Sequence, residues 1–343
     1  MQKSILLPLF LIISLPVLAE FDPGRSGFSV IINNEVYPYR AFATFVLPGE
    51  RLIIRINDQG DSNITASTGQ GVLDQTAPRR WVWNAPAEPG MHELSFLREA
   101  DGEAVNLNVF VMVPSNLLVD GALNGFQIGD YPSQPGDDPL YAHPDGFIEV
   151  TEETLSIPVS PHFVLGQFIN LNGNQFPQYL VLRERLILKL EALLERINDR
   201  GISAESFGIL TGYLTPTVNA ATGRDQYSRH IYGGAAVLIV DSNPEDNMMD
   251  DLNNDNAVND RDGRLIFDIA DELYQEPDKS YLRGGLFLYV GLQKHGPAIM
   301  VDARGFRKRW DDDQDLFADP ARVRSNLEST PAKLPEDFNS EVE

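Results

Sequence analysis

Residues 28–114 alternate apolar and polar side chains in short runs broken by Pro, Gly and Asn, and this pattern limits the fold more than any other feature. The clearest run has apolar side chains at every second position from Val105 to Val113. Strict alternation is typical of a strand with one buried face. Further runs lie at 28–32, 36–37, 42–46, 52–56, 81–83 and 94–96. The pattern predicts a sandwich of two β-sheets.

The spacing of these runs is that of immunoglobulin-like sandwiches, which we predict for residues 25–115, with Trp81 and Trp83 packed in and at the rim of the core. Asn33-Asn34 indicates a tight turn between the first two strands. Residues 116–155 are rich in Pro, Gly and Asp and are interpreted as a connector.

A second, α+β domain is predicted for residues 156–310. A helix over 179–200 is indicated by Leu or Ile at positions 182, 186, 190, 193 and 197, followed by Gly201. Strands are expected at 207–210, 235–240, 286–289 and 298–301, with a further helix at 264–274.

The N-terminus has the features of a secretory signal peptide. Lys3 precedes an apolar run over residues 5–13, and the small residue Ala19 ends the segment. Pro8 and Pro16 interrupt the run, and no other stretch has the length of a membrane span. We therefore predict a signal peptide at 1–19 and an exported, periplasmic protein.

Charge and cysteine content exclude several functions. The chain has no cysteine, which excludes disulfides, thiolate nucleophiles, iron–sulfur clusters and cysteine-bound zinc. The formal charge of −23 argues against nucleic acid as a partner. Much of this charge is local, at residues 241–262 and in the segment 311–343, which we interpret as an acidic disordered tail.

The acidic stretch contains a twelve-residue loop, 251–262, with the spacing of a calcium site. Oxygen-bearing side chains stand at loop positions 1, 3, 5, 9 and 12, and position 7 offers its carbonyl. The segment resembles the dockerin variant of the EF-hand loop, in which Asp ends the loop. The alternative is a merely solvated acidic loop. The upstream residues Asp241, Asn243 and Asp246 could hold a second ion. The predicted calcium ligands are Asp251, Asn253, Asp255, Ala257, Asn259 and Asp262.

Segments in the second domain resemble the zinc D-alanyl-D-alanine carboxypeptidases and related D,D-peptidases, which trim peptidoglycan stem peptides. Residues 228–236 (Ser-Arg-His-Ile-Tyr-Gly-Gly-Ala-Ala) resemble the family signature Ser-x-His-x-x-Gly-x-Ala-x-Asp. Residues 212–216, 284–285, 295–297 and 301–305 with Trp310 resemble further segments in the same order. The resemblance implies an α+β D,D-peptidase-like domain with a calcium-loop insert at 241–263.

The metal ligands that the resemblance implies are mostly replaced. His230 occupies the first ligand position, but Val237 and Met300 occupy the other two, and Leu214 replaces the arginine that polarises the substrate. An alkyl and a thioether side chain are poor zinc donors. A shifted trio of His230, His295 and Asp302 is the alternative. His162 lies in a segment that the family shares and is interpreted as a packing residue.

We therefore predict an exported, catalytically inactive homologue of the D,D-peptidases that binds calcium but not zinc, with peptidoglycan peptide or a cell-wall protein as its partner. The alternatives are an active metallo-D,D-peptidase with shifted zinc ligands, and a purely structural protein whose cleft binds nothing.

Overall fold

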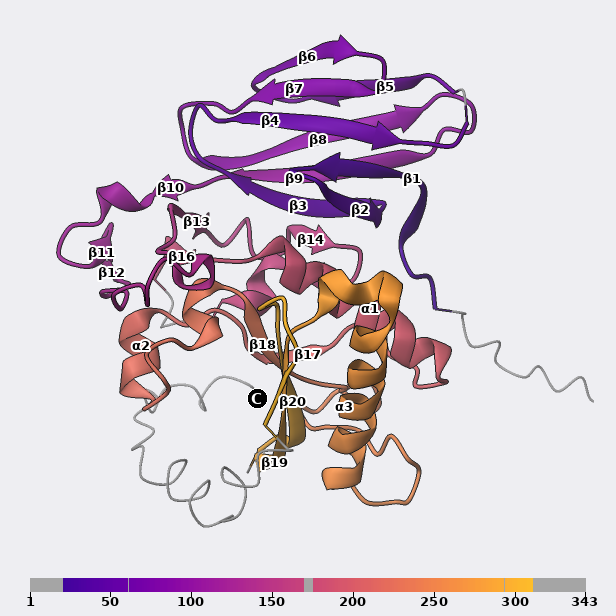
Figure 1. Ribbon diagram of the computed structural model, residues 1–343, viewed down its shortest axis with the longest axis vertical. Helices are drawn as coiled ribbons and strands as arrows, with labels where there is room; N and C mark the ends of the chain where they lie inside the picture. Colours follow the sequence, from indigo (N-terminus) through magenta and orange to yellow (C-terminus); the bar gives the residue numbers. More distant parts are fainter. Residues whose placement is uncertain (1–20, 61, 170–174, 293, 311–343) are drawn as a thin grey trace, which may run out of the picture.

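The computed structural model describes residues 21–60, 62–169, 175–292 and 294–310 of the chain. The predicted signal peptide and the acidic tail lie outside these residues. The described chain is β-rich and multidomain, with a β-sandwich followed by a mixed region in which three helices accompany shorter sheets (Figure 1).

Two sheets face each other in the N-terminal part. The first has the strand order β2-β1-β4-β7-β6, and the second has the order β3-β9-β8-β5, in which β3 and β9 run parallel. The strands are β1 (Arg25–Ile32), β2 (Glu35–Tyr39), β3 (Ala41–Val46), β4 (Arg51–Asn57), β5 (Ile64–Thr68), β6 (Val72–Ala77), β7 (Arg80–Asn84), β8 (Gly90–Arg98) and β9 (Ala104–Val111).

Aromatic side chains join the two sheets. The Trp81 ring of β7 meets the Phe96 ring of β8 edge-on at 5.5 Å, and Trp83 is fully buried. Such an aromatic pair contributes about 0.5–1.5 kcal/mol beyond its area burial. The predicted turn is present, since Asn33 and Asn34 take the left-handed φ of 49° and 66° that a tight hairpin requires. The core position of both tryptophans is confirmed.

The C-terminal part is built on a sheet of order β17-β18-β20-β19-β21, with helix α3 packed on β19 and β20 and helix α1 packed on α3. Its elements are α1 (Glu184–Asp199), β17 (Gly208–Thr211), α2 (Pro216–Ala221), β18 (Ala235–Ile239), α3 (Asp260–Gln275), β19 (Gly285–Leu292), β20 (Gly296–Asp302) and β21 (Lys308–Arg309).

Helix α3 begins four residues before the predicted start at 264. Asn259 caps it, because its side chain accepts from the Arg261 backbone N–H at 3.0 Å, and Asp262 completes a capping box. Acidic residues in the first turn also interact favourably with the helix dipole. The sequence pattern assigned these acids to the loop alone.

Short strands lie between the two parts: β10 (Val113–Pro114), β11 (Ala122–Leu123), β12 (Phe126–Gln127), β13 (Gly146–Val150), β14 (Pro158–Ser160), β15 (Phe163–Val164) and β16 (Gln178–Leu180). Strand β13 lies within the predicted connector, yet it pairs with both β10 and β16. The interpretation of 116–155 as a plain connector needs this correction, because the surrounding Pro, Gly and Asp residues obscure a buried strand.

Polar contacts tie the sandwich to helix α1 and to β14. Arg25 pairs with Glu195 and Arg185 pairs with Glu35. The buried Asn108 side chain of β9 donates to the Pro158 carbonyl at 2.8 Å. One buried hydrogen bond and two more exposed ion pairs therefore join the two parts.

Candidate functional site

The loop at 251–262 is organised by side-chain oxygens that accept backbone N–H groups. Asp251 accepts from the Asp255 N–H at 3.1 Å and from the Asn256 N–H at 2.7 Å. Asn253 accepts from the Asp255 N–H at 2.9 Å. Asn254 and Asn256 take left-handed φ of 59° and 66°, a conformation that Asn tolerates better than most residues. These contacts turn the chain back on itself.

Asp262 closes the loop from the first turn of α3. Its Oδ1 accepts from the backbone N–H groups of Leu252 at 2.9 Å and Asn253 at 3.2 Å, and its Oδ2 accepts from Asn259 at 2.8 Å. The side chain is 0% exposed. Asp262 thus clamps both ends of the loop together, a role that its spacing alone did not reveal.

Two contacts differ from a simple ligand set. The Arg261 guanidinium lies 3.1 Å from Asp255 Oδ2, so a cationic side chain already contacts one predicted ligand. The Ala257 carbonyl accepts from the Asn259 amide at 2.8 Å. Among the residues that the structure describes, His, Asp and Glu side chains form no group of three or more that could hold a metal ion.

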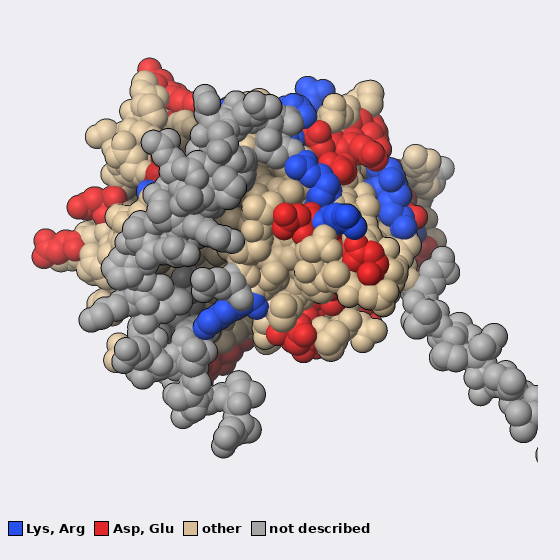
Figure 2. Space-filling view, turned by 90° about the horizontal axis from the view of Figure 1, so that it is seen from below, with Lys and Arg blue, Asp and Glu red and all other residues tan. Residues whose placement is uncertain are grey.

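The preceding stretch repeats the backbone pattern. Asp241 accepts from the N–H groups of Asp246 and Asn247, both at 2.9 Å, and Asp250 accepts from the Ser242 N–H at 2.9 Å. In both loops, the first aspartate (Asp241 or Asp251) accepts from backbone N–H groups four to six residues later in the chain. The last aspartate (Asp250 or Asp262) accepts from the N–H groups of the two residues that follow the first aspartate. Figure 2 shows red groups distributed in several places on the lower face, with Lys and Arg between some of them.

His230, the remaining metal-motif histidine, is buried on the 3₁₀ turn Arg229–Tyr232, with 3% exposure. Its Nδ1 donates to the Gly212 carbonyl at 2.7 Å, and its Nε2 has no hydrogen-bond partner among the described residues. Burial, with the charge of Arg224, lowers its pKa to about 3. The ring is therefore neutral, with a lone pair on Nε2, the arrangement of a metal-ligating histidine.

The other two motif positions provide no further ligand for a metal ion bound to that nitrogen. Val237 on β18 lies directly opposite Met300 on β20, and Phe287 on β19 lies opposite Met300. Val237 is buried and Met300 is half-buried. Zinc takes imidazole, thiolate and carboxylate ligands in proteins. The residues present do not fit a zinc ion.

Leu214, at the position of the substrate-polarising arginine, is also buried, and its backbone N–H donates to the His230 carbonyl at 3.4 Å. The cavity beside it holds about 10 Å³ and is lined mostly by apolar and aromatic side chains. A water molecule requires at least about that volume and polar partners. The surroundings of Leu214 are packed rather than open.

The shifted trio is not brought together. Asp302, 0% exposed, accepts from the Gly285 N–H at 2.8 Å and pairs with Arg304 at 2.6 Å. Burial is the largest influence and opposes its ionisation, but the hydrogen bond and charge of Arg304, the charge of Lys189 and the Gly285 N–H together lower its pKa. His295 lies before the opposite end of β20, about 20 Å away along an extended strand, and donates to the Asn247 carbonyl at 2.6 Å.

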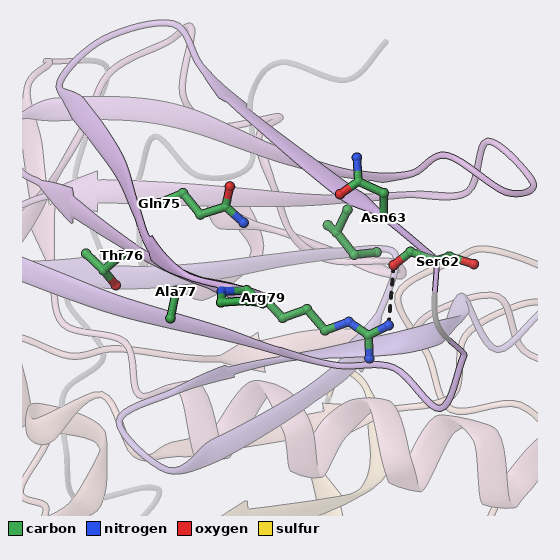
Figure 3. Close-up of a pocket in the computed structure, with 8 residues that line it drawn as sticks. Ser62, Asn63, Gln75, Thr76, Ala77 and Arg79 are labelled. Carbon is green, nitrogen blue, oxygen red and sulfur yellow. Dashed lines mark hydrogen bonds between the residues drawn. The ribbon is translucent and has the colours of Figure 1, made fainter.

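A separate pocket lies at the edge of the sandwich, where β5 and β6 meet. Figure 3 shows the Arg79 side chain extending along it toward Ser62, with Gln75 and Thr76 on the β6 side. Arg79 donates to the Asp58 carbonyl at 2.7 Å and to the Ser62 carbonyl at 3.3 Å. Its guanidinium thus holds the β4–β5 loop in place.

Comparisons with known proteins assign no family. No family model and no curated protein matches the chain. A solved structure titled "ZirS C-terminal Domain" is similar at 10% identity and a TM-score of 0.17, covering 33% of this chain and 83% of that one. A likeness of this size carries no argument about fold or function. Within the described residues, no helix has both the length and the apolar character to cross a membrane.

Proposed function

We propose that the chain is an exported, catalytically silent relative of the zinc D,D-peptidases that acts in the periplasm by binding peptidoglycan peptide or a cell-wall protein. In this proposal, the facing sheets form an immunoglobulin-like module, and residues 156–310 form the D,D-peptidase-like domain. The ordered series of motif segments in the sequence supports the second assignment. The sandwich core supports the first.

One observation carries the loss of catalysis: the ligand positions after His230 are an apolar pair, Val237 facing Met300 across two strands. A zinc site that activates water needs three protein ligands and an open position. Here His230 is the one imidazole at these positions, and Asp302 is occupied by Arg304. The retained fold would then serve for binding rather than for hydrolysis.

Metal analysis of the purified protein tests this proposal directly. We expect less than stoichiometric zinc after incubation with excess zinc and gel filtration, and no D-alanine release from purified muropeptides. A matched variant, Val237→Asp with Met300→His, restores the two ligand positions and is expected to bind zinc. Stoichiometric zinc in the wild-type protein together with D-alanine release would overturn the proposal.

Binding to the cell wall is tested with isolated sacculi. We expect the wild-type protein to sediment with intact sacculi and to remain in solution with sacculi whose stem peptides have been removed enzymatically. Equal sedimentation with both would favour a glycan ligand, and no sedimentation with either would favour the protein partner or the purely structural alternative.

We also propose that the loop 251–262 binds calcium through Asp251, Asn253, Asp255 and Asp262, with Ala257 and Asn259 completing the set. Calcium prefers hard oxygen ligands, which these positions supply. Calorimetry should show binding in the wild-type protein and none in Asp251→Ala/Asp255→Ala. A control of equal charge change, Glu245→Ala/Asp260→Ala, should retain binding. Equal loss in both would assign the effect to net charge alone.

A further inference from the structure

The segment Phe21–Gly24, which precedes β1, is folded against the turn between β14 and β15. The Phe21 ring stacks on the His162 ring at 4.9 Å, with 25° between their planes. Gly24 has a φ of 64°, and a Cβ there would lie 2.3 Å from Pro161 Cβ, so a larger residue does not fit. The Arg40 N–H donates to the Gly24 carbonyl at 2.9 Å.

His162 holds this segment with both ring nitrogens. Its Nδ1 lies 2.7 Å from Glu191 Oε2, and its Nε2 lies 2.9 Å from the Asp22 carbonyl oxygen. Glu191 is 1% exposed and also accepts from the His162 backbone N–H at 3.0 Å. A carbonyl only accepts, and so does a carboxylate, so both ring nitrogens donate. The ring is therefore an imidazolium in a buried ion pair.

The other charged groups near the ring are already paired or open to solvent. Asp22 pairs with Arg40 through its side chain, and Arg25 pairs with Glu195, one turn along α1 from Glu191. The buried Tyr39 hydroxyl lies within electrostatic reach of Glu191. Asp199, the last residue of α1, and Glu205, beyond its end, are exposed and line the cavity beside the ring.

That cavity of about 830 Å³ lies where the segment crosses the second domain. Phe21, Asp22 and His162 form part of its wall, and Ser160 and Ser206 form another part. The Ser160 hydroxyl is buried and has no hydrogen-bond partner among the described residues. Movement of the segment would thus remove one wall of the cavity.

We propose that Phe21–Gly24 is a pH-dependent strap, held against the cavity while both ring nitrogens of His162 carry protons and released when the ring loses one of them. In the neutral ring, one nitrogen has a lone pair in place of a proton. The carboxylate of Glu191 retains the proton on Nδ1, so the contact from Nε2 to the Asp22 carbonyl is the one that is lost.

The direction of the pH dependence follows from the surroundings of the ring. Burial is the largest influence and opposes protonation of His162, but the hydrogen bonds to Glu191 and to the Asp22 carbonyl, with the charges of both acids, together raise its pKa above the ordinary value of 6.5. The strap contact is therefore complete below the ordinary pKa and is lost as pH rises through the raised one.

Hydrogen exchange of the purified protein tests the strap, with exchange times corrected for the intrinsic effect of pH. Protection of the Arg40 amide, which donates to Gly24, should fall at least about tenfold between mildly acid and alkaline pH, the effect of losing one charge-assisted hydrogen bond. In His162→Gln, protection should be low at every pH, because Gln cannot reach both acceptors. His143→Gln, which changes a histidine elsewhere, should keep the wild-type profile.

Nitrogen NMR of the wild-type imidazole gives a readout that depends on no variant. Both His162 ring nitrogens should show protonated shifts at pH 6, and the Nε2 signal should change over the same pH range as the Arg40 exchange. A neutral ring at pH 6, or Arg40 protection that does not vary with pH while the ring titrates, would overturn the strap.

Discussion

Two aspartates in the C-terminal part, Asp262 and Asp302, are both 0% exposed but are stabilised in opposite ways. Backbone N–H groups surround the carboxylate of Asp262 at the start of α3. The guanidinium of Arg304 pairs with the carboxylate of Asp302 at the end of β20. Both satisfy the rule that a buried charge needs partners.

The difference lies in the charge that remains. Backbone donors carry no net charge, so Asp262 keeps its full negative charge, to which Asp251 adds, while Asp255 pairs with Arg261. Arg304 neutralises Asp302, and the buried ammonium of Lys189 donates to its backbone carbonyl at 2.7 Å. The first arrangement still attracts a cation, and the second is complete without one. The two proposals, a D,D-peptidase relative without zinc chemistry and a calcium-binding loop at 251–262, are therefore compatible in one domain.

The largest expected effect is the loss of stability on removing Asp302. Asp302→Ala removes the partner of Arg304 and leaves Lys189 buried without its nearest carboxylate. Breaking such a buried pair costs about 3–5 kcal/mol of unfolding free energy. Urea denaturation measures it, with Glu88→Ala, an exposed carboxylate in the sandwich, as the control. A loss below about 1 kcal/mol, that of an exposed ion pair, would show that Asp302 does not hold this region together.

The next largest effect is that of calcium on stability, which should depend on the loop around Asp262 but not on Asp302. At one hundred times the dissociation constant, a bound ligand adds about 2.7 kcal/mol of stability. We expect calcium to raise the unfolding free energy of the wild type and of Asp302→Asn alike, and to leave Asp251→Ala/Asp255→Ala unchanged. Thermal unfolding with calcium and with chelator measures the difference. An Asp302→Asn variant that no longer responds to calcium would contradict the independence of the two regions.

Lys189 makes the stability of the region around Asp302 depend on pH above neutrality. Burial lowers its pKa from 10.5 to about 7, although the charge of Asp302 opposes the shift. Between these two values, the unfolded chain binds a proton that the folded chain does not, so stability rises with pH by up to about 1.4 kcal/mol per unit. Lys189→Met should lack this rise between pH 7 and 9.5 in urea unfolding. If the unfolding free energies of the wild type and Lys189→Met changed equally with pH, Lys189 would not be the group responsible.

The sequence pattern predicted strands that bury a run or a face of apolar residues and missed strands that bury neither. Strand β4 alternates between exposed and buried at every position and lies almost where it was expected. Strands β5 and β6 were missed because β6 is exposed at nearly every position and both lie at sheet edges. An edge strand that buries no continuous face has no periodicity to detect.

The candidate sites show the same limit. Local spacing was enough to place the loop residues from Asp251 to Asp262 near one another. It did not reveal that Lys189, 113 residues before Asp302, donates to the Asp302 carbonyl. His162 was interpreted as a packing residue, and its ring does stack on Phe21, but its ion pair with Glu191 was missed because that partner lies on a helix later in the chain. Contacts between distant elements require the folded chain.

The smallest effect concerns Arg261. Its pairing with Asp255 resembles the pairing of Arg304 with Asp302. The Arg261 side chain is 78% exposed, so the pair should contribute about 0–1 kcal/mol to stability. Arg261→Ala, however, frees an Asp255 oxygen and makes the loop more negative. We expect stability to change little and calcium affinity to rise by about threefold to tenfold, since calcium affinity depends on ligand charge.

Arg200→Ala is the control, because Arg200 forms an exposed ion pair with Glu272 away from the loop. Removing either arginine changes the net charge equally, so long-range attraction of calcium should increase similarly, and salt should screen it. Only the loss of Arg261 frees a predicted ligand. Calorimetry at 0.15 M and at about 0.5 M salt should therefore show a gain for Arg261→Ala that persists when the gain for Arg200→Ala has disappeared. Equal gains that disappear together would mean that Asp255 is not a calcium ligand.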